Sequence, residues 1–208
     1  LCRVDGLDWV RLMYAYPGAV TDRLIEVMAR EPKVVKYLDI PLQHGHPATL
    51  RRMRRPSNVD WMYKTLDKMR TAMPDLCVRT TFIVGFPGET DAEFDGLVKF
   101  ADDMQFDRVG VFTYSYEADT PSGAMPDQVP HDVAEARRDA LMLRQQRISL
   151  ARNQRLVGKT LTTLIEGVDK KKNVSVGRSY RDAPEVDGLV IIEGTVPAGE
   201  MVPVKITG

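Results

Sequence analysis

The sequence predicts an α/β fold of parallel strands and helices, followed by a small all-β barrel. Over residues 9–116, segments rich in β-branched and aromatic residues alternate with stretches whose apolar residues recur at helical spacing. Such repeated strand–helix units imply parallel strands joined by right-handed crossovers. From about residue 157 onward, short β-rich runs are separated by Gly and Pro, which is typical of a small barrel.

Each predicted strand of the α/β part ends in polar or aromatic residues. The four segments are Trp9–Pro17, Val35–His44, Val78–Glu89 and Arg108–Tyr116. Barrel-type α/β enzymes place their functional residues at the carboxyl ends of parallel strands. Packing alone does not readily explain polar or aromatic residues at the ends of four strands. We therefore expect these strand ends to form a functional site together.

Helices are predicted between and after these strands. Thr90 and Glu93 form a capping-box pattern at the start of one of them. The helix at 131–156 follows a proline-rich loop and has the length of a linker leading out of the first domain. Apolar periodicity and capping residues predict the full set at about 20–31, 47–53, 58 onward, 90–103 and 131–156.

We therefore divide the chain into three parts. Residues 1–130 form the later strands of a partial barrel, residues 131–156 the linker helix, and residues 157–208 the all-β domain. The strands expected in the last part are Thr160–Glu166, Ser175–Arg178, Leu189–Glu193 and Val202–Ile206.

The composition limits the class of protein. Lys plus Arg and Asp plus Glu number 29 each in 208 residues, and zero net charge gives no sign of a polyanionic partner. No apolar run is long enough to cross a bilayer. The two cysteines, Cys2 and Cys77, argue for a reducing compartment, and we expect a cytoplasmic protein. Because the chain begins with Leu1 shortly before a strand, we expect it to be part of a longer protein.

Three motifs have both a functional and a purely structural interpretation. Gly85 permits either the close approach of an adenine to the backbone or an ordinary strand-to-helix turn. His44 and His46 are too few for a zinc site, which needs three or four ligands, so His44 either hydrogen-bonds a ligand or has a structural role. The basic run Arg51–Arg55 is either a solvated helix face or supplies a partner for a carboxylate or phosphate.

Taken together, the motifs resemble the radical S-adenosylmethionine (SAM) methylthiotransferases. The resemblance rests on YLDIPLQH at 37–44, MRRP at 53–56, RTTFIVGFPGET at 79–90 and FTYSYEADTPS at 112–122. GRSYRDAPEVDG at 177–188 is similar to the RimO branch and identifies the tail as a TRAM domain. The resemblance covers nearly the whole chain and implies a partial, TIM-like radical SAM barrel of which only the later strands are present.

The resemblance implies a definite chemistry. Members of the family insert a methylthio group at an unactivated C–H bond, with S-adenosyl-L-methionine and two 4Fe–4S clusters as cofactors. The RimO branch modifies the β-carbon of an aspartate in small-subunit ribosomal protein twelve, so that protein or the ribosome is the expected partner. The family's cluster motif, C-x-x-x-C-x-x-C, is missing here, so we expect this chain to ligate no cluster or other metal and to be inactive alone.

The resemblance also implies roles for individual residues, although it assigns no catalytic residue. Cofactor binding is expected from Gln43, His44, Arg55, Arg79, Ile83, Val84, Gly85, Phe112 and Tyr114. The two arginines are candidate partners for the methionyl carboxylate or for an acid of the substrate. Substrate binding by the TRAM domain is expected from Arg178, Tyr180, Arg181, Asp182, Glu185 and Asp187.

Two alternatives remain open. One is a tRNA-modifying relative of the MiaB branch, in which the TRAM domain binds RNA, and the other is a binding scaffold without activity. From Arg155 onward, eight basic residues stand against seven acidic ones, which disfavours binding to a phosphate backbone. Asp182, Glu185 and Asp187 lie close together in sequence, and we expect these three carboxylates to attract a basic protein loop.

Overall fold

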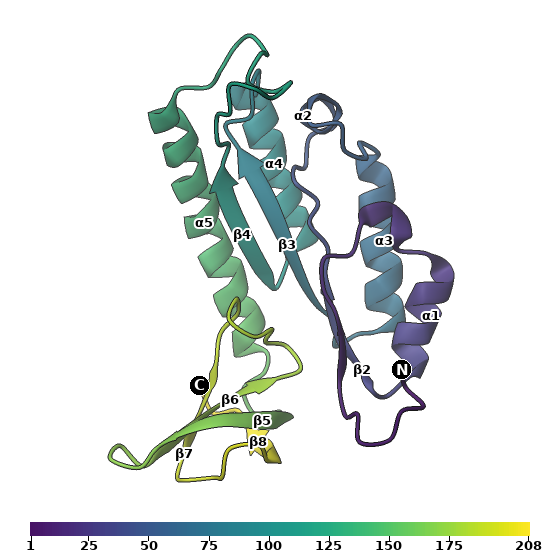
Figure 1. The fold of residues 1–208 in the computed structure, drawn as a ribbon, viewed down its shortest axis with the longest axis vertical. Helices are drawn as coiled ribbons and strands as arrows, with labels where there is room; N and C mark the ends of the chain where they lie inside the picture. The colour runs from purple at the N-terminus through teal and green to yellow at the C-terminus, as the bar shows by residue number, and fades with distance from the viewer.

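Two separate four-stranded sheets organise the chain, and the computed structural model describes residues 1–208 (Figure 1). The first sheet is parallel, in the order β1-β2-β3-β4, and the second is antiparallel, in the order β7-β6-β5-β8. The elements of the first part are β1 Val10–Leu12, the 3₁₀ turn Pro17–Ala19, α1 Asp22–Arg30, β2 Val34–Asp39, α2 Pro47–Arg52, α3 Val59–Ala72, β3 Cys77–Val84, α4 Asp91–Met104, β4 Arg108–Thr113 and α5 His131–Gln154. Those of the second are β5 Thr160–Asp169, β6 Val174–Ser179, β7 Val190–Glu193 and β8 Met201–Lys205.

The parallel sheet has one face covered by helices and one face that carries polar groups. Side chains alternate along β3, so Val78, Phe82 and Val84 enter the core beneath the helices and are fully buried. Arg79 and Ile83 project from the opposite face and remain partly accessible. The alternation confirms the predicted α/β class, and it separates the residues that hold the fold together from those that face a ligand.

The predicted elements of the first part are confirmed in type and order. Each strand is shorter than its sequence segment, because the polar residues at its end leave the sheet and form loops. The capping box predicted at Thr90 and Glu93 is present, with Glu93 N–H donating to Thr90 Oγ1 and Thr90 N–H donating to Glu93 Oε2.

The capping box supports a stability prediction. Thr90→Ala should lower the free energy of unfolding by about 1 kcal/mol, because one orphan N–H of the first helical turn loses its acceptor. Thr71→Ala, at an exposed position inside α3, is the matched control and should be neutral or slightly stabilising, since Ala has the higher helix propensity. Urea denaturation of both variants measures the difference, and equal losses would contradict the capping role.

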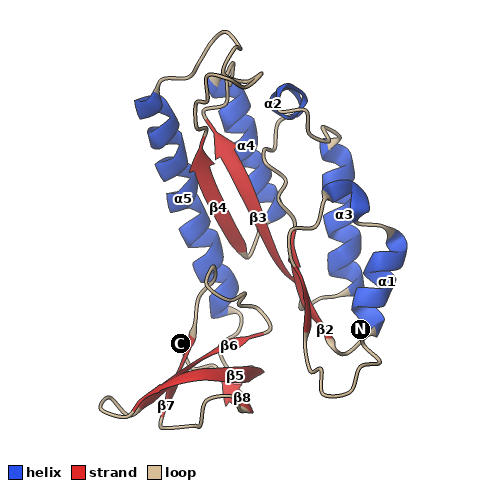
Figure 2. Cartoon of the chain, viewed as in Figure 1, coloured by secondary structure: helices blue, strands red, loops and turns tan.

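The helix predicted as a linker also forms part of the first domain. α5 begins at His131 and packs along the sheet beside β4, burying Ala134, Leu141 and Ile148. The contact with the sheet could not be predicted from the sequence of α5, because arginines and glutamines alternate with the few residues that pack against the sheet. α5 therefore covers the sheet on its way to the second sheet (Figure 2).

The second sheet lies at the end of the molecule where β3 and β4 begin (Figure 1). All four expected strands are present, and β5 continues three residues beyond the predicted Glu166 to Asp169, with an irregularity in its pairing with β6 between Ile165 and Gly167. The antiparallel sheet is curled, as expected for a small barrel. The carboxyl ends of the parallel strands lie at the other end of the molecule. None of the helices is both long and apolar enough to cross a membrane.

Candidate functional site

A pocket opens at the carboxyl ends of β1 and β2, where the sequence predicts a site. Its volume is about 150 Å³. The lining combines aromatic rings, prolines, one amide and one guanidinium: Tyr14, Ala15, Tyr16, Pro17, Pro41, Leu42, Gln43, Arg55 and Pro56. Arg55 is exposed and forms no ion pair, so the only charge in the lining is available to an anionic group.

Backbone hydrogen bonds hold the walls of this pocket. Gln43 N–H donates to the carbonyl of Thr81 at 2.9 Å, and Ile83 N–H donates to the carbonyl of Gln43 at 2.8 Å. Gln43 has a φ of 71° and Tyr14 a φ of 55°, both in the left-handed region that non-glycine residues seldom adopt. Tyr14 N–H donates to Asp39 Oδ2 at 3.2 Å. Unfavourable backbone conformations that the surroundings hold in place are typical of functional loops.

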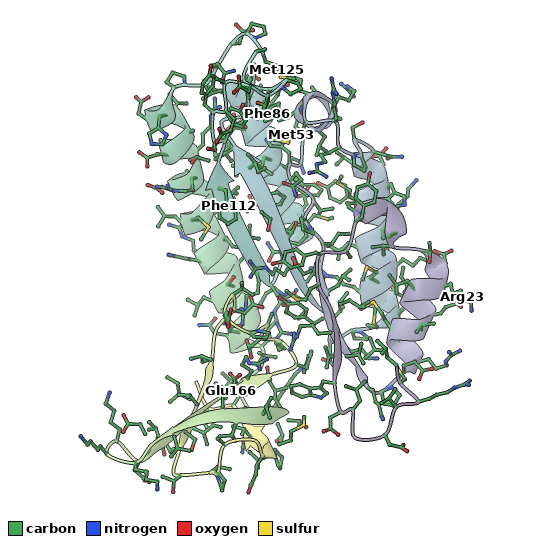
Figure 3. The ribbon with its side chains drawn as sticks, viewed as in Figure 1. Arg23, Met53, Phe86, Phe112, Met125 and Glu166 are labelled. Carbon is green, nitrogen blue, oxygen red and sulfur yellow. The ribbon has the colours of Figure 1, made fainter.

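An apolar surface continues from the pocket across the next two strand ends. Ile83 is the register partner of Phe112, so both side chains project from the same face of the sheet. Phe112 is labelled on its strand in Figure 3. It is 59% exposed. A planar ring could lie on this surface, with polar groups of the same ligand reaching Gln43 and Arg55.

Three of the predicted cofactor residues, Val84, His44 and Tyr114, lie behind this surface. The Val84 side chain is buried in the core, so only its backbone faces the site. His44 is fully buried and points toward Glu89. Tyr114 packs edge-on against Phe86, and its hydroxyl has no hydrogen-bond partner.

Gly85 has a structural explanation that differs from close approach to a ligand. Its φ is 75°, and a Cβ built on it would lie 2.4 Å from Ala134 Cβ on α5. Either feature alone would favour glycine. The space beside Gly85 is therefore occupied by α5, and the glycine requirement does not depend on an adenine ring.

Arg79 lies away from the pocket. Its Nη1 donates to Asp187 Oδ1 of the C-terminal domain at 2.9 Å, and its Nε is 3.7 Å from Asp39 Oδ1. Asp187 Oδ2 also accepts from the Tyr37 hydroxyl at 2.6 Å. Burial and this hydrogen bond raise the pKa of Tyr37. The Arg79 guanidinium thus already has a partner between the two domains, and its role in cofactor binding stays a prediction.

Most of the predicted TRAM substrate residues are also engaged inside the molecule. Arg181 donates to Asp107 at 2.6 Å, Asp182 accepts from Arg108 at 3.1 Å, and the Tyr180 hydroxyl donates to the carbonyl of Asp75. Arg178 pairs with Glu166. Of the three carboxylates expected to attract a basic loop, Asp182 and Asp187 pair with barrel arginines in the structure, and Glu185 is exposed.

Asp107 is the centre of the contact between the two domains. Its fully buried carboxylate accepts hydrogen bonds from Arg152 on α5, from Arg181 of the C-terminal domain and from the backbone of Val78. Burial acts to raise the pKa of Asp107, but the hydrogen bond from Arg152 and the charge of Arg181 outweigh it and hold the pKa below its usual value. The pair of arginines therefore stabilises the ionised carboxylate.

Sequence reasoning missed the residues that support the site from behind. Glu89 and Arg137 form a buried ion pair at 3.0 Å, and Asp39 holds the turn at Tyr14. Asp39 gave a signal, since it is an acidic residue at the end of a mostly apolar strand. Glu89 follows directly on the Gly85 motif. Arg137 gave none, because it is one of many arginines along α5.

The residues present fit S-adenosylmethionine but do not fit an iron–sulfur cluster. S-adenosylmethionine is compatible with the exposed Phe112, the neighbouring Ile83, and the unpaired Arg55 beside Gln43. No group of three or more His, Cys, Asp or Glu side chains is arranged to hold a metal ion, so this chain offers no ligand set for an iron–sulfur cluster.

Comparisons with known proteins match two regions of the chain to known domain families. Residues 2–101 match the model of the radical SAM superfamily, and residues 157–208 match the model of the TRAM domain. The solved structure of coproporphyrinogen III oxidase (HemN) from Escherichia coli, a radical SAM enzyme, aligns with 69% of this chain and 32% of its own, at a TM-score of 0.50 and 16% identity. The fold is thus that of a radical SAM barrel portion followed by a TRAM domain.

Curated relatives show which proteins this chain is most informatively compared with. "Ribosomal protein uS12 methylthiotransferase RimO" of Chloroflexus aurantiacus is 53% identical over 100% of this chain and 46% of its own length. The protein of the same name from Roseiflexus sp. is also 53% identical, over 100% of this chain and 45% of its own. Over its whole length the chain is thus similar to the RimO methylthiotransferases, and it spans about half the length of the curated relatives it matches.

Proposed function

We propose that this chain supplies the later barrel strands and the TRAM domain of a radical SAM methylthiotransferase that modifies ribosomal protein uS12. The observation that carries the proposal is the 53% identity to the uS12 methylthiotransferases, which extends over the barrel portion and the TRAM domain alike. We further propose that the modified atom is the β-carbon of an aspartate, and that uS12 or the ribosome is the partner.

Within this proposal the chain's own residues bind and orient S-adenosylmethionine. The adenine lies on the surface of Ile83 and Phe112, and Gln43 and Arg55 hold polar groups of the methionyl part or an acid of the substrate. When bound, the cofactor supplies one-electron chemistry at an unactivated C–H bond. The proposal assigns the two 4Fe–4S clusters to parts of the relatives' length that this chain does not cover.

Product analysis tests the proposed reaction. The complete protein containing this chain is incubated anaerobically with S-adenosylmethionine, a reductant and sulfide, in separate reactions with uS12 and with unmodified tRNA. Mass spectrometry should find a methylthio group on an aspartate of uS12 and none on tRNA. The 208-residue chain alone is the control and should give no product. A methylthio group on tRNA alone would overturn the proposed substrate.

One observation keeps the tRNA substrate as a second candidate. Lys170, Lys171 and Lys172 lie exposed at the tip of the β5–β6 hairpin. These three lysines form a local basic cluster, which the near-neutral charge count of the whole tail does not show. The two arms of the product analysis distinguish these candidates.

Arg55 provides a prediction about the pocket. Arg55→Met in the complete protein should weaken binding of S-adenosylmethionine or of uS12 by about 10-fold or more, because a hydrogen bond to a charged group contributes about 1.5–3 kcal/mol. Arg51→Met is the control, since Arg51 is equally exposed, lies on the adjoining helix and does not line the pocket. Equilibrium titration of both ligands measures the effect. Equal affinities for the two variants would remove Arg55 from the site.

A further inference from the structure

A buried polar network lies behind the end of β3, outside the proposed ligand surface. It consists of Glu89, Arg137, the backbone N–H of Gly85, His44 and Asp91, and we call it the Glu89 network. The side chains of Glu89 and His44 are fully buried, and that of Arg137 is 8% exposed. Ion pairs this deeply buried are costly unless their hydrogen bonds are nearly complete, so their arrangement is well defined.

Glu89 joins the end of β3 to helix α5. One carboxylate oxygen, Oε2, accepts from Gly85 N–H at 2.9 Å. The other, Oε1, accepts from Arg137 Nη1 at 3.0 Å, and the same nitrogen donates to the Glu89 carbonyl at 3.1 Å. Arg137 Nη2 reaches Asp91, at the start of α4, at 2.7 Å. One guanidinium therefore holds the loop at Glu89 and Asp91 directly, and at Gly85 through the Glu89 carboxylate.

The same part of α5 also contacts the strand end directly. Ala134 lies one turn before Arg137 and fills the space beside Gly85. Gly85 follows Val84 and Ile83, and Ile83 carries the proposed cofactor surface together with Phe112. The direction in which β3 leaves the sheet thus depends on how α5 holds Glu89 and Gly85.

His44 contributes a ring N–H that has no hydrogen-bond acceptor. Its Nδ1 accepts from His46 N–H at 2.9 Å, so the ring proton of a neutral His44 is on Nε2. Nε2 has no hydrogen-bond partner and lies 3.7 Å from Glu89 Oε2. A small displacement of Glu89 would complete this bond. His44 therefore links the end of β2, next to Gln43, to the same carboxylate.

We propose that Arg137 is a positioning residue, which acts through Glu89 to fix the end of β3 and thereby the surface on which the cofactor binds. The inference rests on the proposed function for the identity of the ligand. The position of the strand end, however, can be measured without any ligand.

The first measurement uses the 208-residue chain and follows amide hydrogen exchange by NMR. Arg137→Met should raise the exchange rate of the Gly85 amide by about 10-fold or more, because its acceptor Glu89 loses its anchor. The amide of Leu97, in the buried core of α4, should be unchanged, whereas general destabilisation would accelerate both. Arg138→Met is the matched control, since Arg138 is the next residue on α5 and pairs only with the half-exposed Glu135 and the exposed Asp139. An unchanged Gly85 rate would overturn the inference.

The second measurement uses the complete holoenzyme and follows S-adenosylmethionine binding at equilibrium. Arg137→Met should weaken binding by about 10-fold, and Arg137→Lys should restore part of the affinity. Glu89→Gln, which keeps the side-chain shape, should weaken binding less, and the double variant should be no weaker than Arg137→Met alone. Undiminished affinity in Arg137→Met would overturn the positioning role. Absence of binding by the unmodified protein would instead overturn the proposed function, and the Gly85 exchange rate would still decide the inference.

Discussion

Asp107→Asn should lower the free energy of unfolding by about 3–5 kcal/mol, because the change leaves Arg152 and Arg181 close together without their shared counter-charge. The amide keeps the size of the side chain and retains an acceptor for Val78 N–H. The loss therefore reports the removed charge and not a cavity. Urea denaturation of the 208-residue chain measures it.

The control for this prediction is an exposed acid in a similar pairing. Glu135→Gln removes a carboxylate that faces His131 and Arg138 on the surface of α5, and it should cost less than about 1 kcal/mol. The pH dependence provides a second check. Folding lowers the pKa of Asp107, so the ionised carboxylate stabilises the folded state. This contribution to the free energy of unfolding is complete above the unfolded pKa of about 4, and it is lost as the pH falls through the lower pKa of the folded state. In Asp107→Asn, the free energy of unfolding should therefore fall less steeply as the pH is lowered. Comparable losses in the two variants would contradict the central role of Asp107.

Gly85→Ala should lower the free energy of unfolding by about 3 kcal/mol. Part of the cost, about 1–2 kcal/mol, arises because an alanine adopts the left-handed conformation at φ 75° only with strain. The rest arises because the new methyl group would lie 2.4 Å from Ala134 Cβ, and relief of such overpacking costs about 1–3 kcal/mol. Denaturant unfolding of the variant measures the sum.

A second substitution separates the two costs. Ala134→Gly by itself should cost about 1 kcal/mol, the usual penalty for glycine within a helix. Combined with Gly85→Ala it removes the steric conflict, so the double variant should be about 2 kcal/mol more stable than the sum of the single changes implies. Gly188→Ala, where an added Cβ meets nothing within 4 Å, is the control and should change stability little. Strict additivity would show that Gly85 does not pack against α5.

The fold was predictable because its signals are local. Apolar periodicity gave the helices, and the capping pair of Thr90 and Glu93 marked the start of α4 to the residue. The antiparallel strands followed from short β-rich runs between Gly and Pro. The cover that α5 provides for the sheet was not predictable, because only Ala134, Leu141 and a few others of its residues are buried among many charged ones.

The candidate site was predictable only in part, and the reason is distance along the chain. Gln43 and Arg55 line one pocket, and Ile83 and Phe112 are register partners, as four polar or aromatic strand ends suggested. The partners of Arg79 and Asp182, which are Asp187 and Arg108, could not be predicted because each lies in the other domain. A charged residue at a strand end looks the same in the sequence whether it meets a ligand or another domain.

The long-range contacts between the two domains have a consequence for biosynthesis. Arg11 bonds to the carbonyl of Tyr180, which is 169 residues away, and Tyr37 bonds to Asp187, which is 150 residues away. A ribosome releases the barrel strands well before the last residues that cover their lower end. Until then Tyr37 and Cys77, which are fully buried in the finished protein, lack their cover. The emerging chain therefore presents a transient apolar surface that a chaperone could occupy, and completion of the TRAM domain ends that exposure.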